Sequence, residues 1–125
     1  MALSKDLVFA CKQKLVDTKV RLFNQLLDLK RNVSSREFTG DEGDLSASVA
    51  NENQLYLENI RIRTQLLEIE LALSRIERGT FGICEETNEM IEPQRLLTLP
   101  WTRLSIEGAE LREGRTFSVR SQMFT

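Results

Sequence analysis

Apolar residues in the first part of the chain recur with the spacing of an α-helix. Residues 3–33 contain no proline or glycine, and apolar or small residues return every three or four positions. This spacing places them on one side of a helix, where they can form the seam of a coiled coil. The seam positions are Val8, Cys11, Leu15, Thr18, Leu22, Leu26, Leu29 and Val33.

A second segment, residues 44–78, has the same period and also lacks proline and glycine. The stretch between the two, NVSSREFTGDEGD at residues 32–44, is rich in Ser, Gly and Asp and is expected to break the helix. Two long helices joined by a short connection are expected to pair antiparallel. Asn59 lies in the second seam, where it either fixes the register or faces water. The seam positions are Leu55, Asn59, Ile62, Leu66, Ile69, Leu73 and Ile76.

Residues 79–101 have a different character, with two glycines, two prolines and short β-prone pieces at 80–83 and 89–91. We expect a small compact knot here. A shorter helix is predicted to follow it, and the residues after that helix have the composition of a loose tail. The apolar side chains expected to pack in the knot are Phe81, Ile83, Ile91, Leu96, Leu99, Trp101 and Ile106.

Charge and composition exclude several classes of protein. A net charge of -2 does not suit a protein that coats DNA, because neutralising phosphates requires a basic surface. The chain has no histidine, so it lacks the usual acid/base residue, and we do not expect an enzyme. Charged residues lie close to the N-terminus and no apolar run is long enough to span a bilayer, so we expect neither secretion nor membrane insertion. We therefore expect a cytoplasmic protein whose Cys11 and Cys84 are reduced.

The order of these elements, with ALSRIERGTFGIC at 72–84 and IEPQRLLTLP at 91–100, resembles the DksA/TraR family of RNA polymerase-binding regulators. The finger of that family has the form C-x2-C-x17-C-x2-C. Laid on this chain without a gap, its four zinc-ligand positions fall on Cys84, Thr87, Ser105 and Gly108. A structural zinc site needs four Cys or His donors, so we expect no zinc and no other resident cofactor. Hydrogen bonds between the Thr87 and Ser105 hydroxyls and the backbone, with apolar packing, would then stabilise the knot.

The resemblance predicts a mainly α fold: a long antiparallel coiled-coil hairpin, a small globular zinc-finger-like knot and a C-terminal helix. The expected segments are a first helix at 1–33, an acidic tip loop at 34–44, a second coiled-coil helix at 45–78, the degenerate knot at 79–101, a C-terminal helix at 102–113 and a flexible tail at 114–125.

An acidic motif lies in the turn between the two long helices. The family carries D-x-x-D-x-A at the tip of its coiled coil, and the matching residues here are Asp41, Asp44 and, in place of alanine, Ser46. The resemblance implies that the hairpin enters the secondary channel of RNA polymerase and brings this tip near the catalytic centre. Read locally, the aspartates cap the second helix, and Asp44 is the better placed of the two.

The resemblance also concerns guanosine tetraphosphate, the alarmone of the stringent response. Arg61 and Arg95 fall at basic positions of the family, whereas Glu68 and Ala109 stand where lysine is expected. Because phosphate recognition needs several converging cations, we expect a reduced or absent dependence on this co-regulator. Both arginines are equally well read as ordinary surface residues.

The sequence thus predicts a monomeric regulator that binds RNA polymerase and modulates transcription initiation, without contacting specific DNA sequences. The alternative is a structural or adaptor coiled coil that self-associates through its seams. Light scattering separates the two, because the adaptor would form a stable bundle. A third alternative, an elongation-type factor that promotes transcript cleavage through the same channel, differs only in its C-terminal knot.

Overall fold

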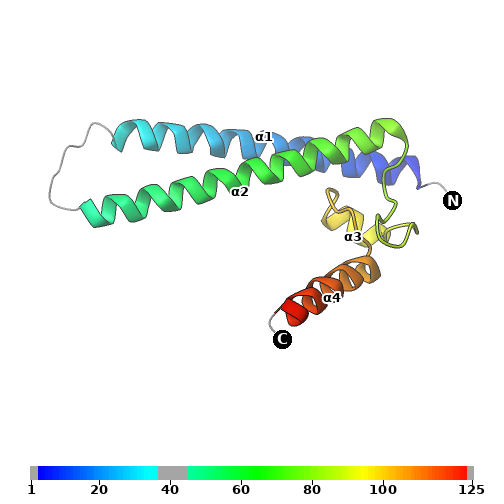
Figure 1. Cartoon of the computed structure of the whole chain (residues 1–125). Helices are drawn as coiled ribbons and strands as arrows, with labels where there is room; N and C mark the ends of the chain where they lie inside the picture. Colours follow the sequence, from blue (N-terminus) through cyan, green and yellow to red (C-terminus); the bar gives the residue numbers. More distant parts are fainter. Residues whose placement is uncertain (1–2, 37–44, 124–125) are drawn as a thin grey trace. The chain divides into compact units, whose positions relative to one another are not determined.

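The structure is a computed structural model and describes residues 3–36 and 45–123. In that part of the chain, the helices in order are α1 (Lys5–Arg36), α2 (Leu45–Arg78), α3 (Pro93–Thr98) and α4 (Ile106–Met123) (Figure 1). The chain divides into two compact units, which we call the hairpin unit (Val16–Glu70) and the finger unit (residues 1–15 and 71–125). None of the helices described is long and apolar enough to cross a membrane.

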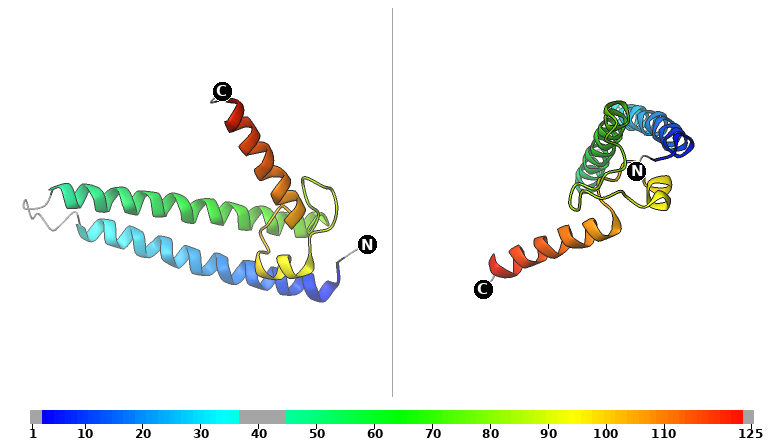
Figure 2. Two further views of the ribbon diagram at one scale, coloured as in Figure 1. Left: turned by 90° about the horizontal axis from the view of Figure 1, so that it is seen from below. Right: turned by 90° about the vertical axis from the view of Figure 1, so that its right-hand side faces the viewer.

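In the hairpin unit, α1 and α2 lie side by side and run in opposite directions (Figures 1 and 2). Seam residues of both helices are buried, among them Leu22 and Leu26 from α1 and Ile62 and Ile69 from α2. Lys19 of α1 forms an ion pair with Glu70 of α2. The predicted mainly α fold with an antiparallel coiled-coil hairpin is therefore confirmed.

The polar seam residue Asn59 finds a partner on its own helix. It is half-buried, and its Oδ1 accepts a hydrogen bond from Nε of Arg63 at 2.7 Å, one turn further along α2. Residues four apart are neighbours on a helix surface, so this bond satisfies the amide oxygen without a group from α1.

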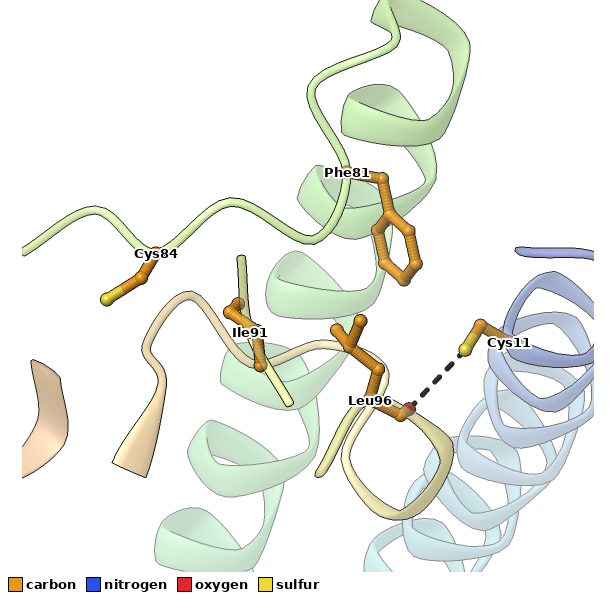
Figure 3. Packing of buried hydrophobic residues seen from close by; sticks show 5 residues of the cluster. All are labelled: Cys11, Phe81, Cys84, Ile91 and Leu96. Atoms are coloured by element: carbon orange, nitrogen blue, oxygen red, sulfur yellow. Dashed lines mark hydrogen bonds between the residues drawn. The ribbon is translucent and has the colours of Figure 1, made fainter. Parts of the chain in front are cut away.

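The finger unit has a core of its own, to which the first turns of α1 contribute (Figure 3). Its buried residues are Cys11, Phe81, Cys84, Ile91 and Leu96. The Cys11 thiol donates to the carbonyl of Leu96 at 3.5 Å. Lys14 Nζ donates to the carbonyls of Leu97 and Thr98 at 3.0 and 2.9 Å. These carbonyls lie in the last turn of α3, where they have no partner within the helix, so α1 supplies the missing donors.

The knot differs from the sequence prediction in three ways. Residues 93–98 form α3, a short helix that starts with proline at its first turn, a favoured position because proline lacks the N–H that would be unpaired there. The β-prone pieces give only an isolated bridge between Ile83 and Met90 in the described residues. Ile83 and Ile106, both expected in the core, are 45% and 53% exposed.

The helix limits also differ from those expected. The segment 102–105 is not helical, and α4 instead begins at Ile106 and continues to Met123, so residues 114–123 form helix where a flexible tail was expected. Gly114 does not stop the helix, and no proline follows it. At the other end of the chain, α1 continues to Arg36, beyond the expected end at residue 33.

Candidate functional site

A tight turn in residues 82–91 presents the first two of the four candidate ligand positions. The N–H of Cys84 donates to the carbonyl of Glu89 at 2.8 Å, and the N–H of Ile91 donates to that of Gly82 at 2.8 Å. Gly82 and Asn88 have positive φ angles of 87° and 58°, a region that Gly and Asn enter more readily than other residues. We call the turn Cys84–Thr87 the first knuckle.

The Thr87 hydroxyl stabilises this knuckle. Its Oγ1 accepts a hydrogen bond from the N–H of Glu89 at 3.3 Å. The N–H of Asn88 also donates to the carbonyl of Cys84 at 2.9 Å and closes the turn. A hydroxyl therefore organises the backbone at a position where the family places a thiolate.

The other two candidate positions open helix α4. Ser105 is 4% exposed, and its Oγ accepts a hydrogen bond from the N–H of Gly108 at 3.0 Å. The N–H of Ala109 donates to the Ser105 carbonyl at 2.9 Å. This pattern is that of an N-cap, in which a serine oxygen satisfies a free N–H of the first helical turn. The expected hydroxyl-to-backbone bonds of Thr87 and Ser105 are thus both present.

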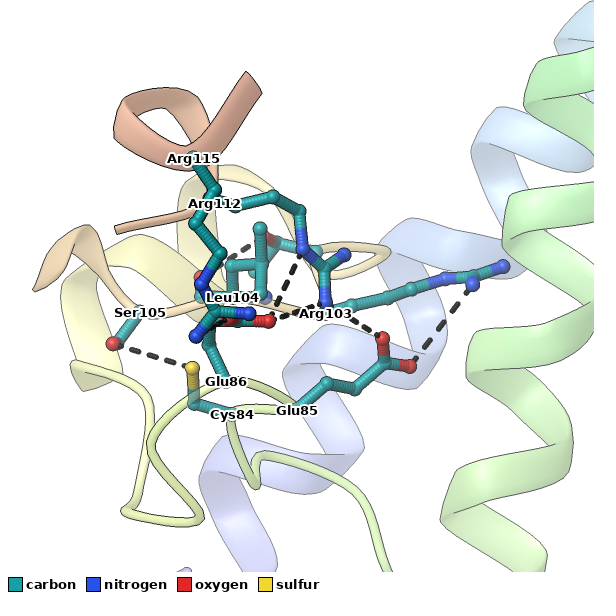
Figure 4. Close-up of polar contacts among 9 residues, drawn as sticks. Cys84, Glu85, Glu86, Arg103, Leu104, Ser105, Arg112 and Arg115 are labelled. Carbon is teal, nitrogen blue, oxygen red and sulfur yellow. Dashed lines mark hydrogen bonds and ion pairs between the residues drawn. The ribbon is translucent and has the colours of Figure 1, made fainter. Parts of the chain in front are cut away.

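The four positions converge on one sulfur atom. The Ser105 hydroxyl donates to Sγ of Cys84 at 3.4 Å (Figure 4). A Cβ added at Gly108 would overlap the same sulfur. Cys84 is fully buried. The structure therefore brings these positions together, although three of them carry no metal-binding group.

Hydrogen bonding changes the acidity of this thiol. Burial acts to raise the pKa of Cys84, but hydrogen bonds from the side chains and backbone of Ser105 and Thr87 outweigh it and lower the pKa to about 6. A hydrogen bond to the charged form of a group favours that form. In contrast, burial raises the pKa of the Cys11 thiol, partly offset by the charge of Lys14.

These residues do not fit a structural zinc ion. Tetrahedral zinc sites take four Cys, His or carboxylate donors, and here a single thiol faces two hydroxyl groups and a glycine. In the described part of the chain, no group of three or more His, Cys, Asp or Glu residues could hold a metal ion. The two carboxylates beside Cys84, those of Glu85 and Glu86, are engaged by arginines.

The other candidate site residues belong to other elements of the chain. Nε of Arg95 donates to the carbonyl of Leu104 at 2.8 Å, which ties α3 to the segment before α4. Arg61 is exposed on α2 and lies 3.9 Å from Glu58 of the same helix. Asp41 and Asp44 lie outside the described residues, and Ser46 belongs to the first turn of α2, with no side-chain position described.

Sequence reasoning did not identify a cluster of charged residues beside the first knuckle. Arg112 and Arg115 of α4 reach Glu86, and Arg112 and Arg103 also approach Glu85 (Figure 4). The only signals in the sequence were the paired acids inside the knuckle and two arginines three residues apart on a helix.

Comparison with known proteins agrees with this finger. Residues 79–114 match the family model described as the prokaryotic dksA/traR C4-type zinc finger. The solved structure of the transcription factor DksA2 from Pseudomonas aeruginosa superposes with a TM-score of 0.84 at 27% identity, covering 90% of this chain and 88% of that one.

Curated sequences extend the match along the chain. The RNA polymerase-binding transcription factor DksA of Caulobacter vibrioides is 32% identical over 107 residues, 83% of this chain and 74% of that protein. An uncharacterized protein of Aquifex aeolicus is 35% identical over 116 residues, 86% of this chain and 77% of that one. A helical hairpin followed by a segment that matches the C4-type finger model defines the class, and the chain belongs to the DksA/TraR family. It is accordingly a member of a family of transcription factors and not an enzyme.

Proposed function

We propose that this protein binds RNA polymerase and regulates transcription initiation, acting as a cytoplasmic monomer without contacting specific DNA sequences. The observation that carries the proposal is the match to the RNA polymerase-binding factor DksA over 83% of the chain. The hairpin also leaves apolar side chains available to a partner. Val20, Phe23 and Leu27 of α1 are about half exposed, and Tyr56 and Leu57 of α2 are more so.

The hairpin is proposed to enter the secondary channel of the polymerase, with Asp41, Asp44 and Ser46 acting near its catalytic centre. The family motif in the sequence supports these assignments, as does the antiparallel pairing of α1 with α2 in the hairpin unit. In this proposal, the two paired helices present the charged tip to the polymerase. Carboxylates placed beside a cation-rich site then act through short-range electrostatics.

Replacing both Asp41 and Asp44 with Asn is expected to abolish the effect on initiation while polymerase binding is retained. The substitution removes two charges and keeps the size of the side chains. The measurements are a pull-down with core RNA polymerase and transcription in vitro. The control is the Asp17→Asn/Asp28→Asn pair, which removes the same charge from α1.

The two measurements separate the possible outcomes. Regulation that survives in the tip variant would rule out the tip role, and no pull-down by the wild type would rule out the proposed function.

We further propose a reduced or absent response to guanosine tetraphosphate, because Arg95 is engaged with Leu104 and Arg61 lies beside an acid. Repeating the transcription assay with the alarmone checks this, and a strong response would contradict it.

We also propose that the finger folds without zinc, since its donors do not fit the ion. A chelator is then expected to leave the thermal unfolding midpoint unchanged, because no metal contributes to the folding free energy. The measurement is thermal unfolding followed by circular dichroism, with and without excess chelator. A zinc-bearing C4-type relative provides the positive control, since its midpoint should fall. A marked drop for this protein would refute the metal-free finger.

A further inference from the structure

The first knuckle contains a buried carboxylate that no role described so far requires. The side chain of Glu86 is 9% exposed, whereas that of its neighbour Glu85 is 43% exposed. Glu86 lies between Cys84 and Thr87, on the side of the knuckle that faces α4 (Figure 4). A carboxylate removed from water to this extent is costly unless cations and hydrogen bonds compensate it.

Helix α4 supplies both compensating cations. Nη2 and Nε of Arg112 lie 2.9 and 3.3 Å from Oε2 of Glu86 and donate hydrogen bonds to it. Nη2 of Arg115 lies 2.6 Å from Oε1. Among the described residues Oε1 accepts no hydrogen bond, so its charge is balanced by the Arg115 guanidinium. Each carboxylate oxygen therefore faces a different arginine.

The two carboxylates differ in how closely they are held. Glu85 lies 3.6 Å from Arg112 and 4.0 Å from Arg103, at a more exposed position. The hydrogen bond to Glu86 is the leading cause that raises the pKa of Arg112, and the charges of Glu86 and Glu85 add to it. Exposed ion pairs of the Glu85 kind contribute little to stability, whereas charge-assisted hydrogen bonds to a buried group contribute more.

We propose that Glu86, Arg112 and Arg115 form an ionic clamp that holds helix α4 on the first knuckle, in place of the metal of a C4-type finger. Zinc would join residues 84 and 87 to residues 105 and 108 through a single ion. Here the links between these segments include the bond from Ser105 to Cys84 and a backbone bond from the N–H of Glu85 to the carbonyl of Arg103. The clamp adds two charged contacts one to two turns further along α4. This inference rests on the proposed metal-free finger and does not depend on polymerase binding.

A clamp of this kind responds to salt in a way that coordination bonds do not. The side chains of Arg112 and Arg115 are 45% and 72% exposed, so dissolved ions reach the pair and screen it. The contact between the first turns of α4 and the first knuckle should therefore weaken as the ionic strength rises. Removing the charge of Glu86 should abolish this response.

Hydrogen exchange of the full chain, followed by mass spectrometry at the backbone amides of residues 106–112, tests the clamp. In Glu86→Gln these amides are expected to exchange about tenfold faster or more than in the wild type. The matched control is Glu85→Gln, which makes the same change one residue earlier and should alter exchange by less than about twofold. Amides of α2 in the hairpin unit normalise the rates.

A salt series completes the test. Raising NaCl from about 0.05 to 1 M should accelerate exchange at residues 106–112 in the wild type and in Glu85→Gln, but not in Glu86→Gln. Equal exchange in the two glutamine variants, or a wild type indifferent to salt, would overturn the clamp. If Glu86→Gln does not fold, Arg112→Gln and the wild-type salt series decide the matter in the same way. Faster exchange on adding a chelator would count against the metal-free finger instead, so the two failures are distinguishable.

Discussion

Replacing Gly108 with valine is expected to lower the free energy of unfolding of the finger unit by about 1–3 kcal/mol, the usual cost of overpacking a filled core. A Cβ at this position would overlap Sγ of Cys84 and lie 3.2 Å from Cβ of Glu86 and 3.3 Å from Oγ of Ser105. These neighbours belong to the first knuckle or form the N-cap of α4, so none can move away without disturbing the turn or the cap. Chemical denaturation measures the change.

Gly114 of the same helix provides the control for this substitution. An added Cβ at Gly114 meets no atom within 4 Å. Changing it to alanine should stabilise α4 by up to about 1 kcal/mol, because alanine has the higher helix propensity. If Gly108→Val were as stable as the wild type, the close contact between α4 and Cys84 would not exist in solution.

The free energy of unfolding is expected to rise as the pH increases from about 6 to 9. The folded protein lowers the pKa of Cys84 to about 6 from its usual value of 9.0. Between these values the unfolded chain keeps the proton and the folded chain has lost it, so the contribution is fully present above pH 9 and lost as the pH falls through 6. One such proton gives a slope of up to about 1.4 kcal/mol per pH unit. Urea denaturation under reducing conditions at several pH values measures it.

Cys84→Ala removes the titrating group and should flatten the profile between these pH values. Burial raises the pKa of the Cys11 thiol above its ordinary value, so Cys11 contributes a change of opposite sign at the upper end of this range. Both proteins contain Cys11, so the difference between their slopes reports Cys84 alone. A wild type and a Cys84→Ala variant with the same slope would show that Cys84 does not ionise on folding. The neutral thiol would then be the acceptor of the hydrogen bonds from Ser105 and Thr87.

The hairpin could be predicted from the sequence because the apolar spacing that specifies each helix is local and repeats along the chain. Leu22, Leu26, Ile62 and Ile69 each follow a spacing that fits one helix face, and all four are buried. The convergence of Cys84 with Ser105 could be predicted for a different reason. The frame of the finger motif is kept without insertion, so the backbone still brings these positions together after most of the ligands have been replaced.

The parts that escaped prediction depend on contacts between distant segments. Ile83 and Ile106 are as hydrophobic as core residues, but both are exposed, Ile83 in the turn and Ile106 as the first residue of α4. The role of Glu86 could not be read from its neighbours, because Glu85 beside it is chemically identical and mostly differs in burial. Only the approach of α4 distinguishes the two.

The bonds from Cys11 and Lys14 to the end of α3 have a consequence for building hybrids with other family members. These bonds join residues 83 to 85 positions apart in the chain. A segment cut at residues 79–114 would leave behind the donors for three consecutive carbonyls and part of the hydrophobic core. A recombined protein should therefore take its opening fifteen residues and its finger from the same parent, with the exchange points placed inside the long helices.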